Sequence, residues 1–257
     1  MAGRQDRILE YVTENRRVDV TDLAAMMAVS TVTIRKDLDR LEKNGLLRRE
    51  HGYAVAAHED NMLSRLAYHH ELKRTIASRV ADTVADGETV MIESGSTCAI
   101  LAEELSRSHR GITIITNSAF IADFTRRNNG ARVVLLGGDY QPESQVCVGP
   151  LTSAGAAGFF VKRLFIGVDG FTAEAGFTGK NHLRAETVRA MAKQAEELVV
   201  MTESIKFPRK GAVRLVPASA VTTVYTDDRL PAPIQSQLTS AGVRVIKVPA
   251  DVPRSAH

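Results

Sequence analysis

The sequence of 257 residues predicts an α/β protein, in which a small helical domain precedes a doubly wound, mostly parallel sheet. Two observations carry this prediction. Over the first fifty residues, apolar residues recur at steps of three and four, as they do on one face of a helix. From residue 71 onward, helical segments alternate with short, continuous apolar runs, which are typical of strands covered on both faces.

The composition narrows the class of protein further. No run of about 18 apolar residues is present, so we expect no membrane-spanning helix. The start, MAGRQDRILE, is charged and lacks the apolar core of a secretion signal. Two cysteines, Cys98 and Cys147, are too few for a disulfide framework or a metal cluster. We therefore expect a cytoplasmic protein without membrane contact, metal or cofactor. The net charge of +3 is too small to indicate nucleic acid by itself.

Three helices are expected in the first domain. The first spans residues 4–14, the second is short and begins near residue 21, and the third spans about 31–44. In the third helix Ile34, Leu38 and Leu41 recur at steps of four and three. These three residues therefore face the core, and the basic residues of the helix lie on its outer face.

A β-hairpin is expected directly after the third helix, in the stretch LLRREHGYAV. Helices joined by a tight turn and followed by such a hairpin fit a winged helix-turn-helix. An ordinary three-helix domain with a solvated charged face is the alternative. Residues expected to contact DNA phosphates or base edges are Ser30, Thr31, Thr33, Arg35, Lys36, Arg40, Arg48, Arg49 and His51.

The segment VDVTDLAAMMAVSTVTIRKDLDRLEKNGLLRREHGYAV closely resembles the N-terminal domain of DeoR-type transcriptional regulators. That family has a VS-x-x-TIR-x-DL core, then LE-x-x-G and R-x-HGG, and this chain matches at nearly every position. Tyr53 departs from the pattern, because it stands where the family has a second glycine in the wing. The resemblance implies that the first domain binds double-stranded operator DNA.

Residues 58–72 are expected to form a linker that turns into a helix near Arg65. The linker contains His58, His69 and His70, which we expect to be solvated rather than metal-bound, because no cysteine or further histidine is spaced to complete a site. The expected domains are therefore 1–57 and 73–250, on either side of this linker.

The second domain is expected to contain seven strands with helices between most of them. Strands are expected at 89–92, 112–116, 132–136, 163–168, 198–201, 222–226 and 243–248. Helices are expected at 71–84, 98–107, 118–128, 150–158, 183–196 and 232–241. In doubly wound sheets of this kind, ligands bind at the carboxyl ends of the strands.

Small and polar residues follow several of these strands. After the first strand, Gly95 allows close backbone approach, and Ser96 and Thr97 offer hydroxyls at a helix N-terminus, which suits a phosphate group. Cys98 in the same turn has no histidine marked as its base, so a packed small residue is favoured over a nucleophile. The expected effector-binding residues are Glu93, Ser94, Gly95, Ser96, Thr97, Thr116, Asn117, Ser118, Gly137, Gly138, Asp169, Gly170 and Lys206.

The second domain also resembles the sensor domain of DeoR-type regulators. That domain carries a D-x-G-[ST]-T loop, a TN-[ST] turn, a GG pair and a D-x-[ST]-K-F segment, and the corresponding stretches here are ESGST, TNS, GG and ESIKF. Glu93 and Glu203 stand where aspartate is usual. The longer side chain moves each carboxylate by one methylene, which is enough to change ligand preference.

The same domain is similar to ribose-5-phosphate isomerase and related sugar-phosphate enzymes, through ESGST and through GVDG with Asp169. Gly170 stands where the isomerase has a second acid, and the glycine run that would position Lys180 and Glu186 is missing. Because proton abstraction needs a positioned base and an electrophile, the resemblance implies ligand binding without turnover.

Taken together, these features predict a regulator and not an enzyme. We expect a repressor of a carbohydrate catabolic operon that binds operator DNA as a homodimer or homotetramer and responds to a phosphorylated sugar. The alternatives are a sugar-phosphate isomerase or deaminase with an appended DNA-binding domain, and a DNA-binding architectural protein whose second domain only forms oligomers.

Overall fold

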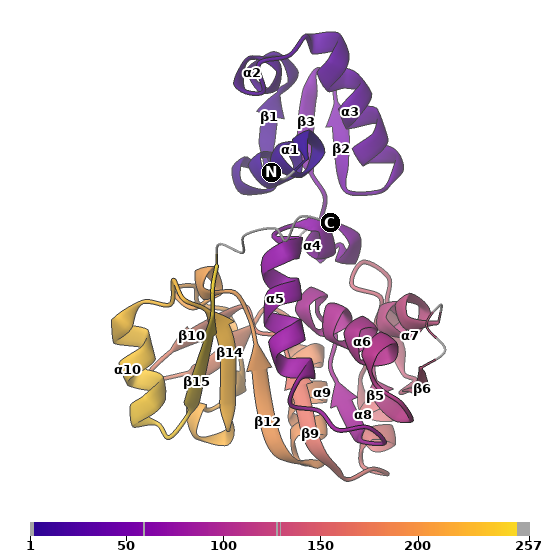
Figure 1. Ribbon diagram of the computed structural model, residues 1–257, viewed down its shortest axis with the longest axis vertical. Coiled ribbons are helices and arrows are strands. Elements are labelled where there is room, and N and C mark those ends of the chain that lie inside the picture. The colour runs from indigo at the N-terminus through magenta and orange to yellow at the C-terminus, as the bar shows by residue number, and fades with distance from the viewer. Residues whose placement is uncertain (1–2, 59, 127, 129, 251–257) are drawn as a thin grey trace. The chain divides into compact units, whose positions relative to one another are not determined.

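The computed structural model describes residues 3–58, 60–126, 128 and 130–250. The chain divides into two compact units, residues 1–70 and 71–257, and each is described by itself (Figure 1). The first unit contains α1 (Arg4–Asn15), β1 (Arg17–Asp19), α2 (Val20–Met26), α3 (Thr31–Lys43), β2 (Leu47–Glu50), β3 (Tyr53–Ala56) and α4 (Met62–Ala67).

The three predicted helices and the hairpin are present in the first unit, and they share one core. Ile8, Leu23, Ile34 and Leu38 are fully buried in it. A short strand that the sequence did not predict, β1, pairs with β3, so the three strands form a small antiparallel sheet in the order β1-β3-β2. The predicted winged helix-turn-helix is thereby confirmed.

The turn between β2 and β3 consists of His51 and Gly52, which have φ values of 38° and 88°. Two left-handed residues in succession are typical of the tight hairpin turn that matches strand twist. Tyr53 lies beyond the turn in β3, and the Arg17 guanidinium carbon lies 3.9 Å from the centre of its ring. The departure from the family pattern at Tyr53 therefore falls in a strand and leaves the turn intact.

The expected linker contains a helix that packs onto the first unit. In α4, Met62 is buried, and the Ser64 hydroxyl donates a hydrogen bond to the Leu46 carbonyl oxygen at 2.6 Å. The Asn61 side chain accepts from the Ser64 amide at 3.0 Å and so caps this helix. The helix begins three residues before the predicted position, because this cap, and not the periodicity, sets its start.

The second unit is built on a parallel sheet. Its strands are β4 (Thr89–Ile92), β5 (Ile112–Thr116), β6 (Ala131–Leu135), β9 (Val161–Ile166), β12 (Ala195–Met201), β14 (Thr223–Asp227) and β15 (Arg244–Val248). Among the described residues these seven strands pair in the order β15-β14-β12-β9-β4-β5-β6, and all the pairings are parallel. The predicted fold class, a doubly wound and mostly parallel sheet, is confirmed.

The helices of this unit connect the strands and cover the sheet. They are α5 (His70–Ala81), α6 (Ser96–Ser108), α7 (Ala119–Thr125), α8 (Pro150–Ala156), α9 (His182–Ala192) and α10 (Ala232–Ser240). Figure 1 shows α5 and α6 on the face of the sheet nearest the viewer. Right-handed crossovers on either side of β4 require α6 and α9 to lie on opposite faces.

Short antiparallel strands that the sequence did not predict extend the loops after the main strands. β7 (Asp139–Gln141) pairs with β8 (Val146–Val148), and β10 (Gly170–Thr172), β11 (Gly176–Gly179) and β13 (Val213–Val216) form a second small sheet. Strands of three or four residues are too short for periodicity to separate from a loop.

The order of the strands defines where a ligand would bind. From β4 the chain builds β5 and β6 on one side, and then returns to build β9, β12, β14 and β15 on the other. The strand order therefore reverses between β4 and β9. In open α/β sheets, the crevice outside the carboxyl ends at such a reversal is the usual ligand site.

Candidate DNA-binding surface and effector site

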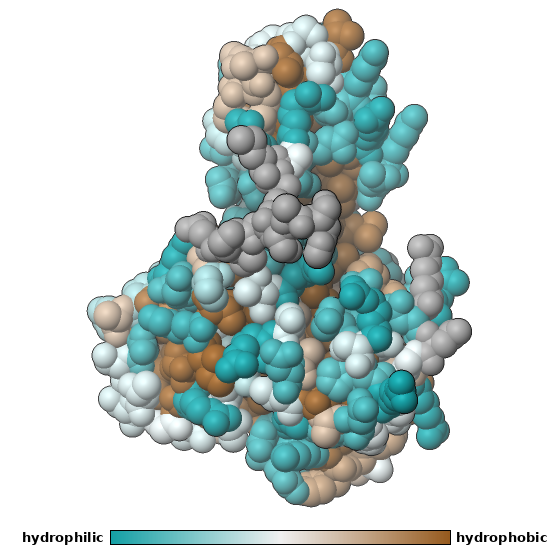
Figure 2. Space-filling model, viewed as in Figure 1, coloured by the Kyte–Doolittle hydropathy of each residue, from teal (hydrophilic) through white to brown (hydrophobic). Residues whose placement is uncertain are grey.

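The third helix of the first unit presents a basic outer face. Arg35, Lys36 and Arg40 are exposed on α3, and Figure 2 shows hydrophilic side chains along this helix. At its N-terminus the Ser30 hydroxyl oxygen accepts from the Thr33 amide at 3.2 Å. Thr31 and Thr33 lie half-buried in the first turn. A helix with this exposed face has the form of a recognition helix, whose N-terminal part enters the major groove.

The inner side of α3 carries a charged residue that sequence analysis missed. Asp37 is buried, and its carboxylate accepts from Arg4 Nε at 2.6 Å and from Gln5 Nε2 at 3.0 Å. Burial alone raises the pKa of Asp37, but these hydrogen bonds and the charges of Arg4 and Arg40 outweigh it and lower the pKa below its ordinary value. This contact ties α1 to the recognition helix.

The hairpin that follows α3 carries the remaining predicted DNA contacts. Arg48 and His51 are exposed on β2 and in its turn. Arg49 is held against the helix, because its guanidinium pairs with Asp39 and its amide donates to Glu42 Oε1 at 2.7 Å. Both arginines therefore lie near an acid, Arg49 beside Asp39 of α3 and Arg48 with its Nη2 4.0 Å from Glu50 Oε1.

The turn predicted to hold a phosphate lies at the carboxyl end of β4. Gly95 has φ 153° and ψ 152°, a backbone conformation that favours glycine, and it precedes the first residue of α6. Gly95 has no side chain that could cap the helix, and its carbonyl oxygen accepts from the Ala99 amide at 2.8 Å. Ser96 and Thr97 begin the helix, and both are buried. A helix N-terminus of this kind is suited to an anion.

A chain of hydrogen bonds precedes this turn. The Ser94 hydroxyl donates to Glu93 Oε1 at 2.8 Å and accepts from Arg184 Nη2 at 3.1 Å. The same guanidinium nitrogen lies 3.9 Å from Glu93 Oε1. Because the Glu93 amide donates to the Phe165 carbonyl oxygen of β9 at 2.9 Å, this chain lies at the reversal between β4 and β9.

The end of the neighbouring strand β5 contributes buried polar groups. The Asn117 amide nitrogen donates to the Cys147 carbonyl oxygen at 3.0 Å, but its Oδ1 has no hydrogen-bond partner among the described residues. A buried acceptor left unpaired costs about 1–3 kcal/mol, so this oxygen is suited to a donor from a ligand. Thr116 and Ser118 have local roles, since Thr116 Oγ1 accepts from the Ser118 amide and Ser118 caps α7.

The second glycine after β6, Gly138, has a packing role. A Cβ atom on Gly138 would collide with the Thr152 hydroxyl and lie 2.6 Å from the Val148 carbonyl oxygen. The Thr152 hydroxyl donates to the Gly137 carbonyl oxygen at 2.8 Å. This close approach lets α8 and β8 pack against the strand end, which explains Gly138 without a ligand, whereas a Cβ on Gly137 would meet no atom within 4 Å.

Two further strand ends bring predicted residues together. After β9, Asp169 Oδ1 lies 3.4 Å from Lys206 Nζ, which comes from the turn that follows β12. In the same turn Glu203 Oε2 lies 3.7 Å from Lys73 Nζ of α5, and both side chains are buried. The turn is held in place by Asp227, whose carboxylate accepts from the Ser204 amide at 2.6 Å and from its hydroxyl at 2.7 Å.

Three residues stand at positions where an isomerase would use acids and a lysine, and each can be located in the structure. Gly170, in place of a second acid, packs so closely against the Arg209 carbonyl oxygen that a side chain there would collide with it. Glu186 is exposed and pairs with His182 on its own helix, 3.3 Å away. Lys180 is also exposed. The buried Cys98 has its Sγ 3.9 Å from the Phe165 carbonyl oxygen.

Three of these residues were missed by sequence analysis. Lys73 had a readable signal, because it shares the apolar face of its helix with Ile76 and Val80 at spacings of three and four. Asp227 directly follows the strand predicted at 222–226 and could have been counted with the other strand ends. Arg184 had no such signal, since 90 residues separate it from Ser94, and only the tertiary structure brings the two together.

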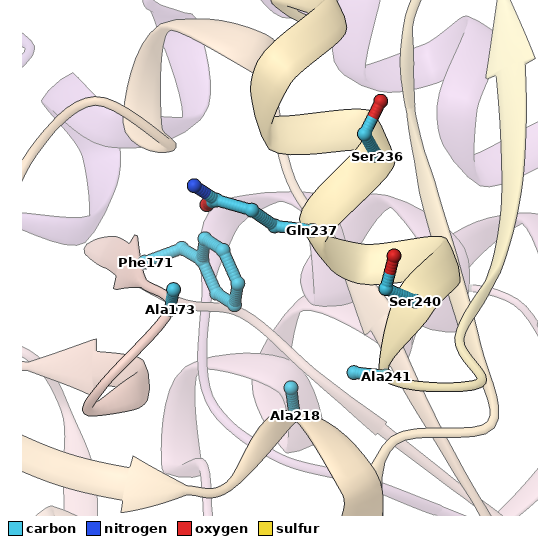
Figure 3. A pocket seen from close by; sticks show the side chains of 7 residues that line it. All are labelled: Phe171, Ala173, Ala218, Ser236, Gln237, Ser240 and Ala241. Atoms are coloured by element: carbon cyan, nitrogen blue, oxygen red, sulfur yellow. The ribbon is translucent and has the colours of Figure 1, made fainter.

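The turn at residues 93–97 is largely covered, with the exposed fraction of each polar residue between 1% and 6%. A pocket of about 430 Å³ lies elsewhere, between α10 and the β10 segment (Figure 3). Figure 3 shows Phe171 facing Gln237 across it. Its lining is neutral and consists of Phe171, Ala173, Ala218, Ser236, Gln237, Ser240 and Ala241. A pocket without charged groups is not suited to a phosphate.

Within the described part of the chain, no cluster of three or more histidine, cysteine, aspartate or glutamate side chains is placed to hold a metal ion. None of the helices there combines the length and apolar character that crossing a bilayer requires.

Comparison with known proteins identifies both units. A DeoR-like helix-turn-helix domain matches residues 4–60, and a DeoR C-terminal sensor domain matches residues 68–228. The chain is 30% identical to a protein of Escherichia coli O157:H7 assigned as an aga operon transcriptional repressor, over 95% of this chain and 93% of that protein. It is 26% identical to the glycerol-3-phosphate regulon repressor of Escherichia coli strain K12, over 94% and 97% of the two chains.

Among solved structures, ribose 5-phosphate isomerase A from Methanocaldococcus jannaschii aligns with 54% of each chain, at 17% identity and a TM-score of 0.40. The family models account for the DNA-binding unit and for most of the sheet. The chain therefore belongs to the DeoR family of DNA-binding transcriptional regulators and is not an enzyme.

Proposed function

We propose that this protein is a cytoplasmic repressor of a carbohydrate catabolic operon, and that a phosphorylated sugar bound in the second unit changes its affinity for operator DNA. The observation that carries this proposal is the polar turn at Gly95, which opens α6 at the reversal of strand order and lies beside Glu93, Ser94 and Arg184. The names of two relatives, an aga operon repressor and a glycerol-3-phosphate regulon repressor, agree with it.

The phosphate group would bind at the N-terminus of α6. The amides of Ser96 and Thr97 point out of the first turn, where the helix dipole favours an anion. The cations at the same edge of the sheet, Lys73 and Lys206, each lie beside an acid. A phosphate arriving there would compete with Glu203 or Asp169 for these cations.

Binding at this turn requires movement, because the turn is covered in this structure. A ligand that binds only an opened form shifts the protein toward that form, by as much as its affinity differs between the two. We propose that this movement is the regulatory step, and that it changes how the DNA-binding units of the oligomer are positioned to bind the operator.

The protein would bind its operator as a homodimer or homotetramer. A single helix-turn-helix reads only one half-site, and paired half-sites one helical turn apart require paired recognition helices. Linking two such domains raises the overall affinity without any new contact.

An electrophoretic mobility-shift experiment tests the proposal. The full-length protein and the promoter DNA upstream of its own operon are titrated with a panel of sugar monophosphates, with inorganic phosphate as control. Release or tightening of DNA by one compound, recovered unchanged, supports a sensor. Chemical conversion of that compound would support the isomerase alternative. If no compound alters DNA binding, the result would support the alternative of an architectural protein whose second domain only forms oligomers.

A further inference from the structure

The position of Arg184 is not explained by its own helix. Arg184 lies in the first turn of α9, where its amide donates to the capping side chain of Asn181 at 3.0 Å. A cation is disfavoured at this end of a helix, because the helix dipole is positive there, and this first turn contains no acidic residue to offset it. A contact with another part of the unit must therefore offset the unfavourable position of Arg184 at this end of the helix.

That contact is with the turn after β4. The Arg184 side chain is 14% exposed, and its Nη2 donates to the Ser94 hydroxyl at 3.1 Å and lies 3.9 Å from Glu93 Oε1. The Ser94 hydroxyl in turn donates a hydrogen bond to Glu93 Oε1 at 2.8 Å. The result is a half-buried donor, Arg184, beside a buried acceptor, Glu93, with the Ser94 hydroxyl between them.

This pair lies next to the proposed phosphate position. Glu93 and Ser94 directly precede Gly95, and α6 begins at Ser96, so a ligand whose phosphate binds the helix N-terminus would place its neighbouring carbons beside the pair. Asn117 Oδ1, at the end of the adjacent strand β5, has no hydrogen-bond partner in the described part of the chain and is a second buried acceptor at this edge of the sheet.

The chemistry of the pair selects one kind of group. A carboxylate accepts a hydrogen bond and a guanidinium donates one, so together they match two neighbouring hydroxyls, of which one donates and the other accepts. A second phosphate would be repelled by Glu93, and an ammonium group by Arg184. The pair is thus suited to the neutral, hydroxylated part of a ligand.

We infer that Arg184 and Glu93 form the specificity-determining pair of the sensor, which binds two neighbouring hydroxyls of a singly phosphorylated sugar or polyol. This inference rests on the proposed function, because it assigns the part of the same site that the phosphate does not occupy. Arg184 acts through its planar fork, which Lys cannot reproduce.

Isothermal titration of the full-length protein tests the inference. The probes are glucose 6-phosphate, ribose 5-phosphate, their 2-deoxy analogues, fructose 6-phosphate and inorganic phosphate. The variants are Arg184→Met, which keeps the apolar stem, and Arg184→Lys, which keeps the charge. The control is Arg189→Met on the same helix, whose guanidinium donates to the Arg214 carbonyl oxygen and not to the turn at Ser94.

We expect Arg184→Met to weaken binding of the best hydroxylated sugar phosphate by about 10- to 100-fold, the usual loss for a hydrogen bond to a charged group. Binding of the analogue that lacks one of the two hydroxyls should fall much less, and binding of inorganic phosphate should not change. Arg184→Lys should lose the same affinities as Arg184→Met. If Arg184→Met does not fold, the affinities of Arg184→Lys test the inference in its place. Arg189→Met should behave as the unmodified protein.

Equal weakening for all probes, or none for any of them, would overturn the inference and leave the proposed function standing. If the unmodified protein binds none of the sugar phosphates, the proposed function fails, and the inference fails with it.

Discussion

Lys73 and Glu203 show how single residues join separate elements of the second unit. The two side chains are 3% and 5% exposed, and the pair connects α5 to the turn that carries Lys206. Burying two charges is costly, so such a pair adds little net stability, but removing one partner leaves the other charge buried without its main counter-ion.

We expect Lys73→Met and Glu203→Gln each to lower the free energy of unfolding by about 3–5 kcal/mol. The double variant should lose clearly less than the sum of the two, because it removes both charges together. Urea unfolding of the four proteins measures this difference. Strict additivity would show that the two residues do not interact in solution.

Asp37 in the first unit predicts a dependence of stability on pH. Its pKa in the folded state is lowered, because hydrogen bonds from Arg4 and Gln5 outweigh the effect of burial. The carboxylate therefore stabilises the unit above the unfolded-state pKa of about 3.9, and this stabilisation is lost as the pH falls through the lower folded-state value.

Asp37→Asn should lower the urea midpoint of the first unit at neutral pH, and the difference from the unmodified protein should shrink below about pH 4. Unfolding curves recorded by circular dichroism at several pH values provide the measurement. Asp22→Asn, at an exposed position of α2, is the control and should change little. A difference that is constant at all pH values would show that the Asp37 charge has no part in it.

At the scale of elements, we propose that DNA binding depends on the outer face of α3. Arg35, Lys36 and Arg40 are exposed on it, and Arg48 is exposed on the hairpin that follows. Arg49 is also exposed on this hairpin, and its guanidinium forms an ion pair with Asp39. Exposed cations that meet phosphates release counter-ions, which makes the affinity depend on salt.

Replacing Lys36 by alanine should weaken operator binding and reduce the slope of log K against log salt by about 1, if its partner is a phosphate. Arg35→Ala should do the same or, if it reads a base edge, cost about 1–3 kcal/mol and relax sequence preference. Fluorescence anisotropy at four salt concentrations measures both. Lys162→Ala in β9 of the other unit is the control. An unchanged affinity and slope would remove both residues from the DNA contact.

At the scale of the whole molecule, the chain divides into two compact units, and we propose a DNA-binding surface on the first and an effector site on the second. If an effector changes operator affinity by some factor, linkage requires that operator DNA change the effector affinity by the same factor. The coupling lies typically between about 5- and 150-fold. This relation holds whatever route the coupling follows through the chain.

We therefore expect the effector dissociation constant, measured by titration with and without saturating operator DNA, to change by the factor seen in the mobility shift. A non-operator duplex of the same length is the control. Unequal factors would mean that the compound acts on the DNA complex by a route other than binding to the second unit.

The sequence by itself determined the elements and the two domain types. The helix α3 and the strands β4 and β5 form where they were predicted. A buried helix face shows as apolar residues at steps of three and four, and a buried strand shows as a continuous apolar run, so both can be recognised in the sequence. The polar residues at strand ends could be predicted for the same reason, since each directly follows its strand. Short strands such as β1 and β10 could not be predicted, because three residues show no period.

Only the tertiary structure decided which charges meet. Arg184 reaches Ser94 across 90 residues, Lys73 meets Glu203, and Arg49 meets Asp39. Such contacts depend on the strand order, which places β4 beside β9, and on the helix faces turned toward the strand ends. Local sequence cannot specify them, because the distance between two side chains in the folded chain is set by packing and not by their separation along it.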